Sequence, residues 1–407
     1  MSLIDYIKEH NTWIGFYDNR TDSGHFSRGE EYAFYRFIRD KRYIPYYNNI
    51  KNGIPLSNPV KKSIAKGDSN KKRIVYTYSQ EENYLLKLIT HLIIRKYDSI
   101  FSPNLYSFRS GHSVSGAIRK ITGTKDIEKY YTYKADISNY FNSIDVVKLL
   151  PMLREALSDD AKLYGFLADM LKNPYSIENG KTICESKGAM AGTPTAVFFA
   201  NLYLSELDKE LDNSGIMYFR YSDDIIIFAR SEEQIHRGRE TILGHIKKLG
   251  LTINPNKEVY THPGEQWSFL GFSYSGGKID ICPMSIYKIK AKMRRKARAL
   301  LRWKRKKGKT NIMAARAFIK AFNKKFYETG NAHEMNWSRW YFPVITTESG
   351  LKEIDSYMQA CIRYIIAEKH TKSNYNFRYA QMKELGYTSL VSNWYKGKQA
   401  NNPKSNR

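Results

Sequence analysis

The chain has 407 residues, of which 66 are Lys or Arg and 40 are Asp or Glu, so the formal net charge is +26. Hydrophobic residues make up 42% of the chain, which excludes a disordered protein and allows more than one domain. The excess of positive charge indicates a polyanionic partner. We expect nucleic acid rather than a membrane, because no apolar run approaches the roughly 20 residues of a spanning helix.

The three cysteines, Cys184, Cys282 and Cys361, are widely spaced and odd in number. This pattern matches neither a disulfide framework nor a zinc site and favours a reducing compartment, so we expect a cytoplasmic protein. The first residues lack a basic segment followed by an apolar core, so we expect no signal peptide.

The sequence of the N-terminal third predicts helices before and after one basic hairpin. The pattern predicts a helix over Arg28–Arg39 in a polar, aromatic N-terminal segment. Residues 61–76 predict a basic β-hairpin that turns at residues 67–70, and an apolar-faced helix follows around Leu85 and Ile89. Such a hairpin suits a triphosphate, although a solvated cationic loop fits the same residues. A further helix is expected to begin near Ser113.

The middle of the chain carries the first acidic position of interest. A β-prone segment ends at Asp136, and a turn and helix follow. An acid at a strand end is well placed beside a neighbouring hairpin tip, although Asp136 also fits a helix cap. Residues 187–195 predict a Gly/Pro loop before a long apolar helix that reaches about Asp212. Its small residues allow close approach of a nucleotide or backbone, and a plain loop before a buried helix is the alternative.

Two adjacent carboxylates, Asp223 and Asp224, lie between two apolar, β-prone runs. Met217–Tyr221 and Asp224–Ala229 predict two strands, and the short join permits only a tight hairpin. The unbroken apolar second run predicts that both of its faces are covered. Like charges at such a tip are costly unless a cation neutralises them, which indicates a divalent metal ion; an ordinary solvated turn is the alternative.

The last third predicts short strands and then a basic helical region. Residues 232–249 predict an amphipathic helix, residues 251–258 a strand and turn, and residues 269–280 a hairpin with a Gly-Gly turn. Residues 288–309 predict a strongly basic helix suited to a phosphate backbone, with a merely solvated basic face as the alternative. Helices are also expected near residues 314–327 and 351–370.

Several motifs, in this order, resemble those of reverse transcriptases over about residues 45–400. Tyr-Ser-Asp-Asp at 221–224 resembles the Tyr-x-Asp-Asp box of that family, and Asp136 followed by Phe141 resembles its first catalytic-acid motif. Gly-Thr-Pro-Thr at 192–195, with the helix after it, resembles the template and nucleotide loop.

Two further motifs extend the resemblance. Phe-Leu-Gly-Phe at 269–272 resembles the primer grip. Phe-Arg-Ser-Gly at 108–111 resembles the Gly-Phe-Arg motif of intron-type and retron-type enzymes, with Ser107 in place of the glycine. The resemblance implies an α+β, right-hand polymerase fold with an antiparallel palm sheet. The implied segments are an N-terminal extension (1–45), fingers (46–125), palm (126–282), a basic helical thumb (283–400) and a polar tail (401–407).

The resemblance also implies the roles of individual residues. Asp136, the Ile137 carbonyl and Asp223 would hold two Mg²⁺ ions, with Mn²⁺ as a substitute, and Asp224 would support the site. Lys257 would protonate the leaving pyrophosphate. The remaining assignments are Lys66, Arg73, Phe141 and Gly192 for the deoxynucleoside triphosphate, Phe269, Leu270, Gly271 and Phe272 for the primer, and Lys292, Arg295, Arg298 and Arg302 for the nucleic-acid backbone.

One departure from the family pattern bears on function. Ala191 precedes Gly192 where the family usually has Gln-Gly, which puts ordinary templated copying in question. The chain is most similar to bacterial defence-associated reverse transcriptases, related to retron and abortive-infection enzymes. This implies an RNA-directed DNA polymerase with a non-coding RNA template, a DNA primer or product and a role in antiphage defence. The alternatives are a template-independent or protein-primed DNA polymerase and a non-catalytic, maturase-like RNA-binding protein.

Overall fold

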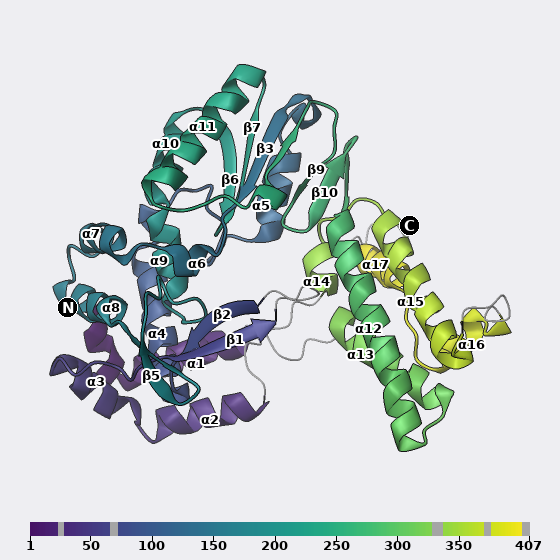
Figure 1. Ribbon diagram of the computed structural model, residues 1–407, viewed down its shortest axis with the longest axis horizontal. Coiled ribbons are helices and arrows are strands. Elements are labelled where there is room, and N and C mark those ends of the chain that lie inside the picture. The colour runs from purple at the N-terminus through teal and green to yellow at the C-terminus, as the bar shows by residue number, and fades with distance from the viewer. Residues whose placement is uncertain (23–27, 66–71, 328–336, 370–375, 401–407) are drawn as a thin grey trace. The chain divides into compact units, whose positions relative to one another are not determined.

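The computed structural model describes residues 1–22, 28–65, 72–327, 337–369 and 376–400 (Figure 1). The chain divides into two compact units, one of residues 1–120 and 124–265 and one of residues 121–123 and 266–407. The finer division into five segments stays a prediction. Lys66, the expected hairpin turn at residues 67–70 and the polar tail at 401–407 lie outside the described residues.

The first unit begins with helices packed around a long central helix, α4 (Gln80–Lys96). A capping box starts α4, because the Ser79 hydroxyl accepts from the Glu82 N–H while the Glu82 carboxylate accepts from the Ser79 N–H. The predicted helix over Arg28–Arg39 is confirmed as α2. The other early helices are η1 (Leu3–Lys8), α1 (His10–Asp22), α3 (Tyr43–Lys51), η2 (Asp98–Ile100) and α5 (Val114–Thr122).

The basic hairpin belongs to a four-stranded sheet of order β2-β1-β4-β5. Its strands are β1 (Val60–Ala65), β2 (Lys72–Thr77), β4 (Tyr175–Glu178) and β5 (Lys181–Cys184). β1 pairs antiparallel with β2, as predicted, and parallel with β4 through Val60 and Ile177. The hairpin of β4 and β5, which the sequence pattern did not indicate, therefore extends the sheet.

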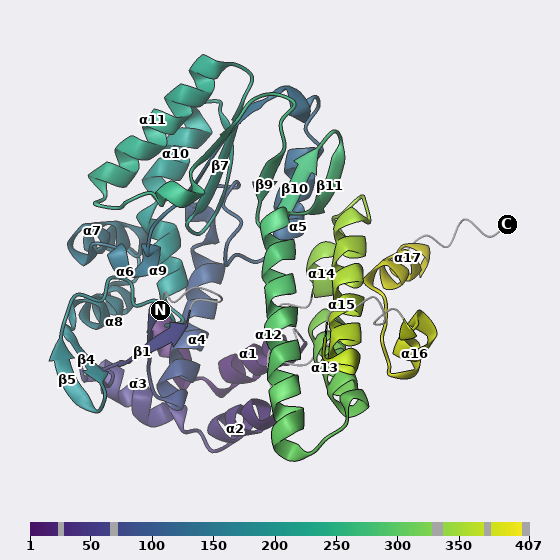
Figure 2. The same cartoon turned by 45° about the vertical axis from the view of Figure 1, so that its right-hand side comes forward.

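A second four-stranded sheet, of order β6-β7-β3-β8, is antiparallel throughout. Its strands are β3 (Tyr131–Asp136), β6 (Met217–Tyr221), β7 (Asp224–Ala229) and β8 (Val259–Thr261). Figures 1 and 2 show α10 (Ser205–Asn213) and α11 (Glu232–Lys248) side by side against this sheet. A Cβ added to Gly238 of α11 would lie 2.6 Å from Cδ1 of Ile227, so glycine allows the helix to pack this closely.

Two sequence-based expectations for the first unit were wrong in detail. The apolar helix expected to reach Asp212 is broken at Leu204 into α9 (Ala196–Tyr203) and α10. α9 is buried around nearly its whole circumference, whereas α10 buries only one stripe, so a single straight helix does not satisfy both. A strand was expected within residues 251–258, but the strand of this region is β8, which begins at Val259. Pro255 instead starts the short helix η4 (Pro255–Lys257), with Asn254 as its cap.

The remaining helices of the first unit complete its core. They are η3 (Ile127–Lys129), α6 (Tyr140–Ser143), α7 (Val146–Ala156) and α8 (Ala161–Lys172). Asp145 and Asp160 cap α7 and α8 by accepting from the N–H groups of Val147 and Leu163. One continuous hydrophobic core links these helices to the N-terminal helices and the β3–β7 sheet.

The second unit joins a small antiparallel sheet, of order β11-β10-β9, to a helical bundle. The strands are β9 (Trp267–Phe269), β10 (Phe272–Ser275) and β11 (Lys278–Ile281), and the predicted Gly-Gly turn joins the last two. Figure 2 shows α12 (Pro283–Lys307), α13 (Asn311–Tyr327) and α15 (Ser349–Ala367) packed alongside one another. The shorter helices are α14 (Trp337–Tyr341), α16 (Tyr379–Glu384) and α17 (Leu390–Ala400). Within the described ranges, no helix is both long and apolar enough to cross a membrane.

Candidate active site

The two adjacent carboxylates lie at the tip of the β6–β7 hairpin. Tyr221 pairs with Asp224 across the two strands, so Ser222 and Asp223 form the turn. Ser222 has a φ of +59°, a left-handed conformation that residues other than glycine seldom adopt. Residues 225–228 of β7 are buried on both faces, as the unbroken apolar run predicts. The turn is therefore mounted on a rigid, buried strand pair.

Strand β3 brings Asp136 beside this tip. Asp136 is the last residue of β3 and lies opposite Asp224 in the antiparallel register. The Ile137 N–H donates to the Asp223 carbonyl, with 3.2 Å between N and O, and the Asn254 N–H donates to the Asp136 carbonyl over 2.7 Å. Asp136 and the adjacent pair Asp223 and Asp224, which are far from it in the sequence, thus converge at one end of the sheet.

Convergence of three carboxylates makes ionisation costly. Burial, followed by the charges of Asp136 and Asp224, raises the pKa of Asp223 to about 6. Asp136 itself is 5% exposed. The site therefore holds more negative charge in a partly desolvated position than its surroundings easily tolerate, and groups with strongly shifted pKa values are typical of functional sites.

Two lysines neutralise part of this charge. Lys257 Nζ lies 2.5 Å from Asp136 Oδ2, and Lys134 Nζ lies 3.9 Å from Asp224 Oδ1. Burial by itself would lower the pKa of Lys257, but its hydrogen bond to Asp136 and the attraction of all three carboxylates raise it. Lys257, expected to be a proton donor, lies here as the counter-ion of Asp136.

The donor set has the chemistry of a site for hard divalent ions. Carboxylates and a backbone carbonyl supply the oxygen ligands that Mg²⁺ prefers. Binding of a cation would relieve the repulsion that raises the pKa of Asp223. Among the described residues, however, no group of three or more His, Cys, Asp or Glu side chains is already arranged as a ligand set. The residues fit such an ion once the Lys257 ammonium leaves Asp136.

The segments expected to hold the nucleotide are joined by hydrogen bonds. The Ala189 N–H donates to the Phe141 carbonyl over 2.8 Å, and the Tyr76 N–H of β2 donates to the Ala191 carbonyl over 2.7 Å. The Ala191 N–H donates to Asn142 Oδ1 over 3.0 Å. The loop before α9 is thereby tied both to α6, which carries Phe141, and to β2.

Gly192 is required by the protein backbone itself. It has a φ of +100°, and an added Cβ would lie 3.0 Å from Val75 Cβ and 3.1 Å from the Tyr76 carbonyl oxygen. The close approach that this glycine permits is therefore to strand β2. Arg73 lies exposed on the same strand, opposite Ile64. Lys66, which was expected to act with Arg73, lies outside the described residues.

The residues expected to grip the primer lie in the second unit. Phe269 ends β9, Phe272 begins β10, and both side chains are buried in the core. Leu270 and Gly271 form the turn between them with φ values of +51° and +90°. Contact with a nucleic-acid strand at this hairpin would therefore come from the turn.

The four basic residues singled out on α12 are all exposed and follow one another at spacings of three and four residues. Lys292, Arg295 and Arg302 lie on one exposed stripe, at spacings typical of a helix face. Arg298, one helical turn from both Arg294 and Arg302, also lines a cavity of about 110 Å³ against α15, as Arg294 does. The other residues of that cavity are Ala297, Tyr357, Ala360, Cys361 and Tyr364.

Comparison with known proteins assigns the family. The family model described as reverse transcriptase (RNA-dependent DNA polymerase) matches residues 64–274, just over half of the 407 residues. The chain belongs to the reverse transcriptase family. Membership and the mixed helical and antiparallel-sheet elements confirm the predicted α+β, right-hand polymerase fold class.

Individual relatives are more distant. The chain is 24% identical over 232 residues to the Retron Ec86 reverse transcriptase of Escherichia coli, and the match covers 56% of this chain and 66% of that protein. It is also similar to apo telomerase from Candida tropicalis truncated from its C-terminal domain, with a TM-score of 0.46, 13% identity and 56% of each chain covered. Telomerase from Candida albicans with a fragment of telomeric RNA matches 88% of this chain and 68% of its own, with a TM-score of 0.46 and 11% identity.

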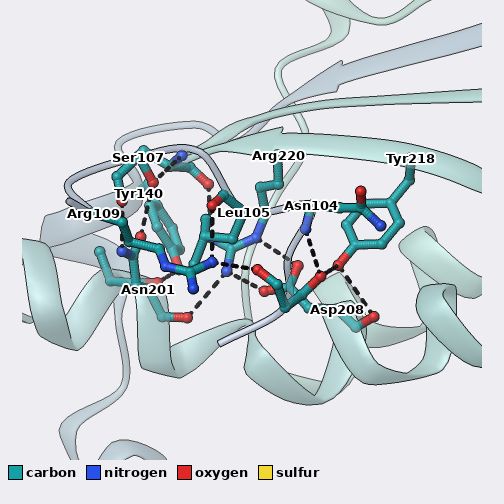
Figure 3. Close-up of polar contacts among 12 residues, drawn as sticks. Asn104, Leu105, Ser107, Arg109, Tyr140, Asn201, Asp208, Tyr218 and Arg220 are labelled. Atoms are coloured by element: carbon teal, nitrogen blue, oxygen red, sulfur yellow. Dashed lines mark hydrogen bonds and ion pairs between the residues drawn. The ribbon is translucent and has the colours of Figure 1, made fainter. Parts of the chain in front are cut away.

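This reverse transcriptase also has a buried ion pair behind the Asp-Asp turn, which we did not predict from the sequence. Arg220 of β6 is 1% exposed and donates through Nε to Asp208 of α10 over 2.7 Å, with a second contact from Nη2 (Figure 3). Burial by itself would lower the pKa of Arg220, but the attraction of Asp208 raises it. Burial also pushes the pKa of Asp208 upward. We take the pair as ionised, because the carboxylate accepts two charge-assisted hydrogen bonds.

A weak signal for this pair exists in the sequence. Arg220 points inward from a strand that is otherwise apolar or aromatic, and Asp208 lies on the apolar stripe of α10 between Leu207 and Leu211. A charge at such a position is rarely buried without a partner. The sequence does not say, however, which two of its many charges meet.

Proposed function

We propose that this protein is an RNA-directed DNA polymerase that synthesises cDNA by phosphoryl transfer at the β3–β7 sheet end. The observation that carries the proposal is the register pairing of Asp136 with Asp224 beside Asp223, whose pKa is raised to about 6. Two Mg²⁺ ions, or Mn²⁺ in their place, would be held by Asp136, Asp223 and the Ile137 carbonyl, with Asp224 in support. When bound, such ions stabilise charge on the attacking and leaving oxygens.

The surrounding residues would bind and orient the nucleotide. Arg73 would neutralise the incoming triphosphate, since a guanidinium presents paired donors to phosphate oxygens. Phe141 would lie against the sugar and favour deoxynucleotides, and Gly192 keeps the adjoining loop against β2. Lys257 would give a proton to the leaving pyrophosphate once it is released from Asp136. The hydrogen bonds that join Phe141, Ala191 and β2 support a pocket built from these segments.

The template and primer would lie on basic surfaces. A net charge of +26 and the exposed stripe of Lys292, Arg295 and Arg302 suit the phosphate backbone, which is gripped without regard to sequence. Arg298 would add a contact beside this stripe, and the turn at Leu270 and Gly271 would contact the primer.

Removing single carboxylates tests the proposal. We expect Asp136→Asn and Asp223→Asn each to lower the rate of DNA synthesis on an RNA template with a DNA primer by at least about 10³-fold. Glu233→Gln, which removes a carboxylate whose side chain is 81% exposed on α11, should leave the rate unchanged. Undiminished synthesis by the Asp136 and Asp223 variants would dismiss the catalytic assignment.

A finer proposal concerns the cellular role. We infer that the protein makes cDNA from a partner non-coding RNA, in antiphage defence and in the cytoplasm, and the likeness to a retron reverse transcriptase supports the reverse transcription alone. The cysteines Cys184, Cys282 and Cys361 are free thiols, which fits a reducing compartment. Sequencing the RNA and DNA that co-purify with the protein should yield one RNA and its complement. Cells carrying Asp223→Asn should lose protection from phage, and retained protection would favour a non-catalytic RNA-binding role.

A second candidate, template-independent or protein-primed DNA synthesis, is favoured by Ala191. This residue is 3% exposed, and its backbone groups are bonded to Asn142 and Tyr76. No side-chain amide is therefore available at the position where the resemblance leads one to expect glutamine. Products of random or homopolymeric sequence would support this candidate, and a faithful copy of one RNA would reject it.

A further inference from the structure

The backbone of Ser222, the left-handed residue of the Asp-Asp turn, is held from both sides by side chains. Its N–H donates to the Ser107 hydroxyl oxygen over 2.9 Å, and its carbonyl accepts from Arg220 Nη1 over 3.1 Å. Ser222 is 4% exposed, so water does not substitute easily for either partner. Its own hydroxyl has no hydrogen-bond partner among the described residues, so the backbone alone is clamped.

Ser107 is itself fixed by a reciprocal pair of hydrogen bonds. Its hydroxyl donates to Asn201 Oδ1 over 2.9 Å, and Asn201 Nδ2 donates back to the Ser107 carbonyl over 2.9 Å. Ser107 is fully buried and Asn201 is 1% exposed. Because the single hydroxyl proton is used on Asn201, the oxygen lone pairs are left to accept from the turn.

The segment that carries Ser107 is anchored to the outer edge of β6. The Arg220 N–H donates to the Asn104 carbonyl over 3.0 Å, and the Tyr106 N–H donates to the Arg220 carbonyl over 2.9 Å. Arg109 then ties the segment to Asp98 through Nε over 2.7 Å and Nη2 over 2.9 Å. Figure 3 shows Ser107, Asn201 and Arg220 pointing toward one another from three different elements.

We propose that Ser107 is a positioning residue for the catalytic turn: its hydroxyl, oriented by Asn201, holds the Ser222 amide and so sets the location of the Asp223 carboxylate. This rests on the proposed polymerase function. The motif that the Ser107 region resembles has glycine at this position, which would supply no acceptor. The Ser107 hydroxyl therefore makes a contact with the backbone of the Asp-Asp hairpin that the side chain of a glycine could not make.

Hydrogen exchange tests the clamp without any need for activity. In Ser107→Ala, the amides of the turn at residues 221–224 should exchange at least about 10-fold faster than in the wild type. Ser107→Thr, which keeps the hydroxyl, should restore slow exchange. The matched control is Ser176→Ala, because Ser176 is also fully buried in the first unit but its hydroxyl donates to Glu185, which follows β5, and not to the turn. It should leave exchange at residues 221–224 unchanged.

Steady-state kinetics on an RNA template with a DNA primer test the consequence. We expect Ser107→Ala to lower kcat about 10- to 100-fold, to raise the Mg²⁺ concentration for half-maximal rate, and to change the KM for the nucleotide by less than about threefold. Ser176→Ala should lose a similar amount of Tm with kcat unchanged. Asn201→Ala leaves the Ser107 hydroxyl but removes the Oδ1 that accepts from it and the Nδ2 that donates to the Ser107 carbonyl, and it should show a smaller effect of the same kind.

The outcomes separate the two proposals. Wild-type exchange at residues 221–224 in both Ser107→Ala and Asn201→Ala would overturn the clamp, whether or not the protein makes DNA. Faster exchange with wild-type kcat and Mg²⁺ dependence would overturn the positioning role. A wild-type protein that makes no DNA would fail the proposed polymerase function, and the exchange data would still decide whether Ser107 holds the turn.

Discussion

The ammonium of Lys257 lies 2.5 Å from Oδ2 of Asp136, the acid that ends strand β3. The side chain of Asp136 is 6% exposed and that of Lys257 is 48% exposed, so the lysine can swing into solvent while the acid cannot. In this arrangement Lys257 occupies the place that a divalent cation would take beside Asp136. If the protein holds Mg²⁺ as proposed, lysine and metal ion would therefore compete for this carboxylate.

Replacing Lys257 should strengthen metal binding. We expect Lys257→Met to lower the Mg²⁺ concentration at half-maximal stabilisation several-fold, because the competing ammonium is gone. In EDTA the same variant should lose only about 1 kcal/mol of unfolding free energy, since the lysine is half exposed and the pair is screened. Thermal unfolding during a Mg²⁺ titration measures both effects. Lys257→Arg keeps the charge and serves as the control; an unchanged Mg²⁺ midpoint in Lys257→Met would contradict the competition.

The raised pKa of Asp223 predicts a stability that falls as pH rises. Its folded value of about 6 lies above the unfolded value of about 3.9, so the folded state holds the proton more tightly. Stability from this group is complete below about pH 4, declines by roughly 3 kcal/mol as the pH rises to about 6, and stays low above that. Asp223→Asn has no proton to lose. The difference in unfolding free energy between this variant and the wild type, measured in EDTA, should therefore shift in favour of the variant as the pH rises from 4 to 7.5. Mg²⁺ should make this difference smaller.

Breaking the Arg220–Asp208 pair should destabilise the first unit strongly. Arg220→Met leaves the Asp208 carboxylate buried without its partner, at a cost of about 3–5 kcal/mol. The double variant Arg220→Met/Asp208→Leu should regain most of that stability but not the polymerase activity, because the Ser222 carbonyl still lacks its donor. Urea unfolding and primer extension measure the two quantities. Arg237→Met, which breaks the exposed pair of Arg237 with Glu233, should cost less than about 0.5 kcal/mol.

Two glycines separate backbone strain from crowding. Gly192 and Gly180 both have positive φ values, of +100° and +78°, but only Gly192 would place an added Cβ against its neighbours, Val75 and Tyr76. Gly180→Ala should cost about 1 kcal/mol from strain alone. Gly192→Ala should cost about 1–3 kcal/mol more and raise the KM for the nucleotide. Equal losses of stability in the two variants would show that the contact with β2 is not close.

The exposed face of α12 should govern the salt dependence of nucleic-acid binding. Removing one basic side chain that binds a phosphate lowers the slope of log affinity against log salt by about 0.7–0.9. We expect Lys292→Gln and Arg302→Gln each to reduce the slope by about that amount, whatever the sequence bound. Lys320→Gln removes an exposed charge from α13 and should leave the slope unchanged. Binding titrations over a range of salt concentrations on a defined RNA–DNA duplex would measure it, and equal slopes for all variants would remove α12 from the interface.

Local patterns in the sequence were enough to predict the helices and strands that depend mainly on residues close together in the chain. The apolar run of residues 225–229 and the two-residue join before it determine the β6–β7 hairpin and its acidic tip, and the basic periodicity of residues 288–307 determines α12. The motif order was enough to indicate the family. These features depend on side-chain alternation, turn length and helical spacing, all of which are properties of short segments.

Tertiary structure decided what surrounds the tip. Nothing local shows which residues Ser107, Asn201 and Asp208 will contact, and each acquires its role only because separate elements bury it beside its partner. The break at Leu204 and the strand pairing of β1 with β4 are likewise outcomes of packing. A buried hydrogen bond or ion pair offsets the free energy of removing its groups from water only when both partners are held in place. The whole fold holds them in place, and neither segment could do so alone.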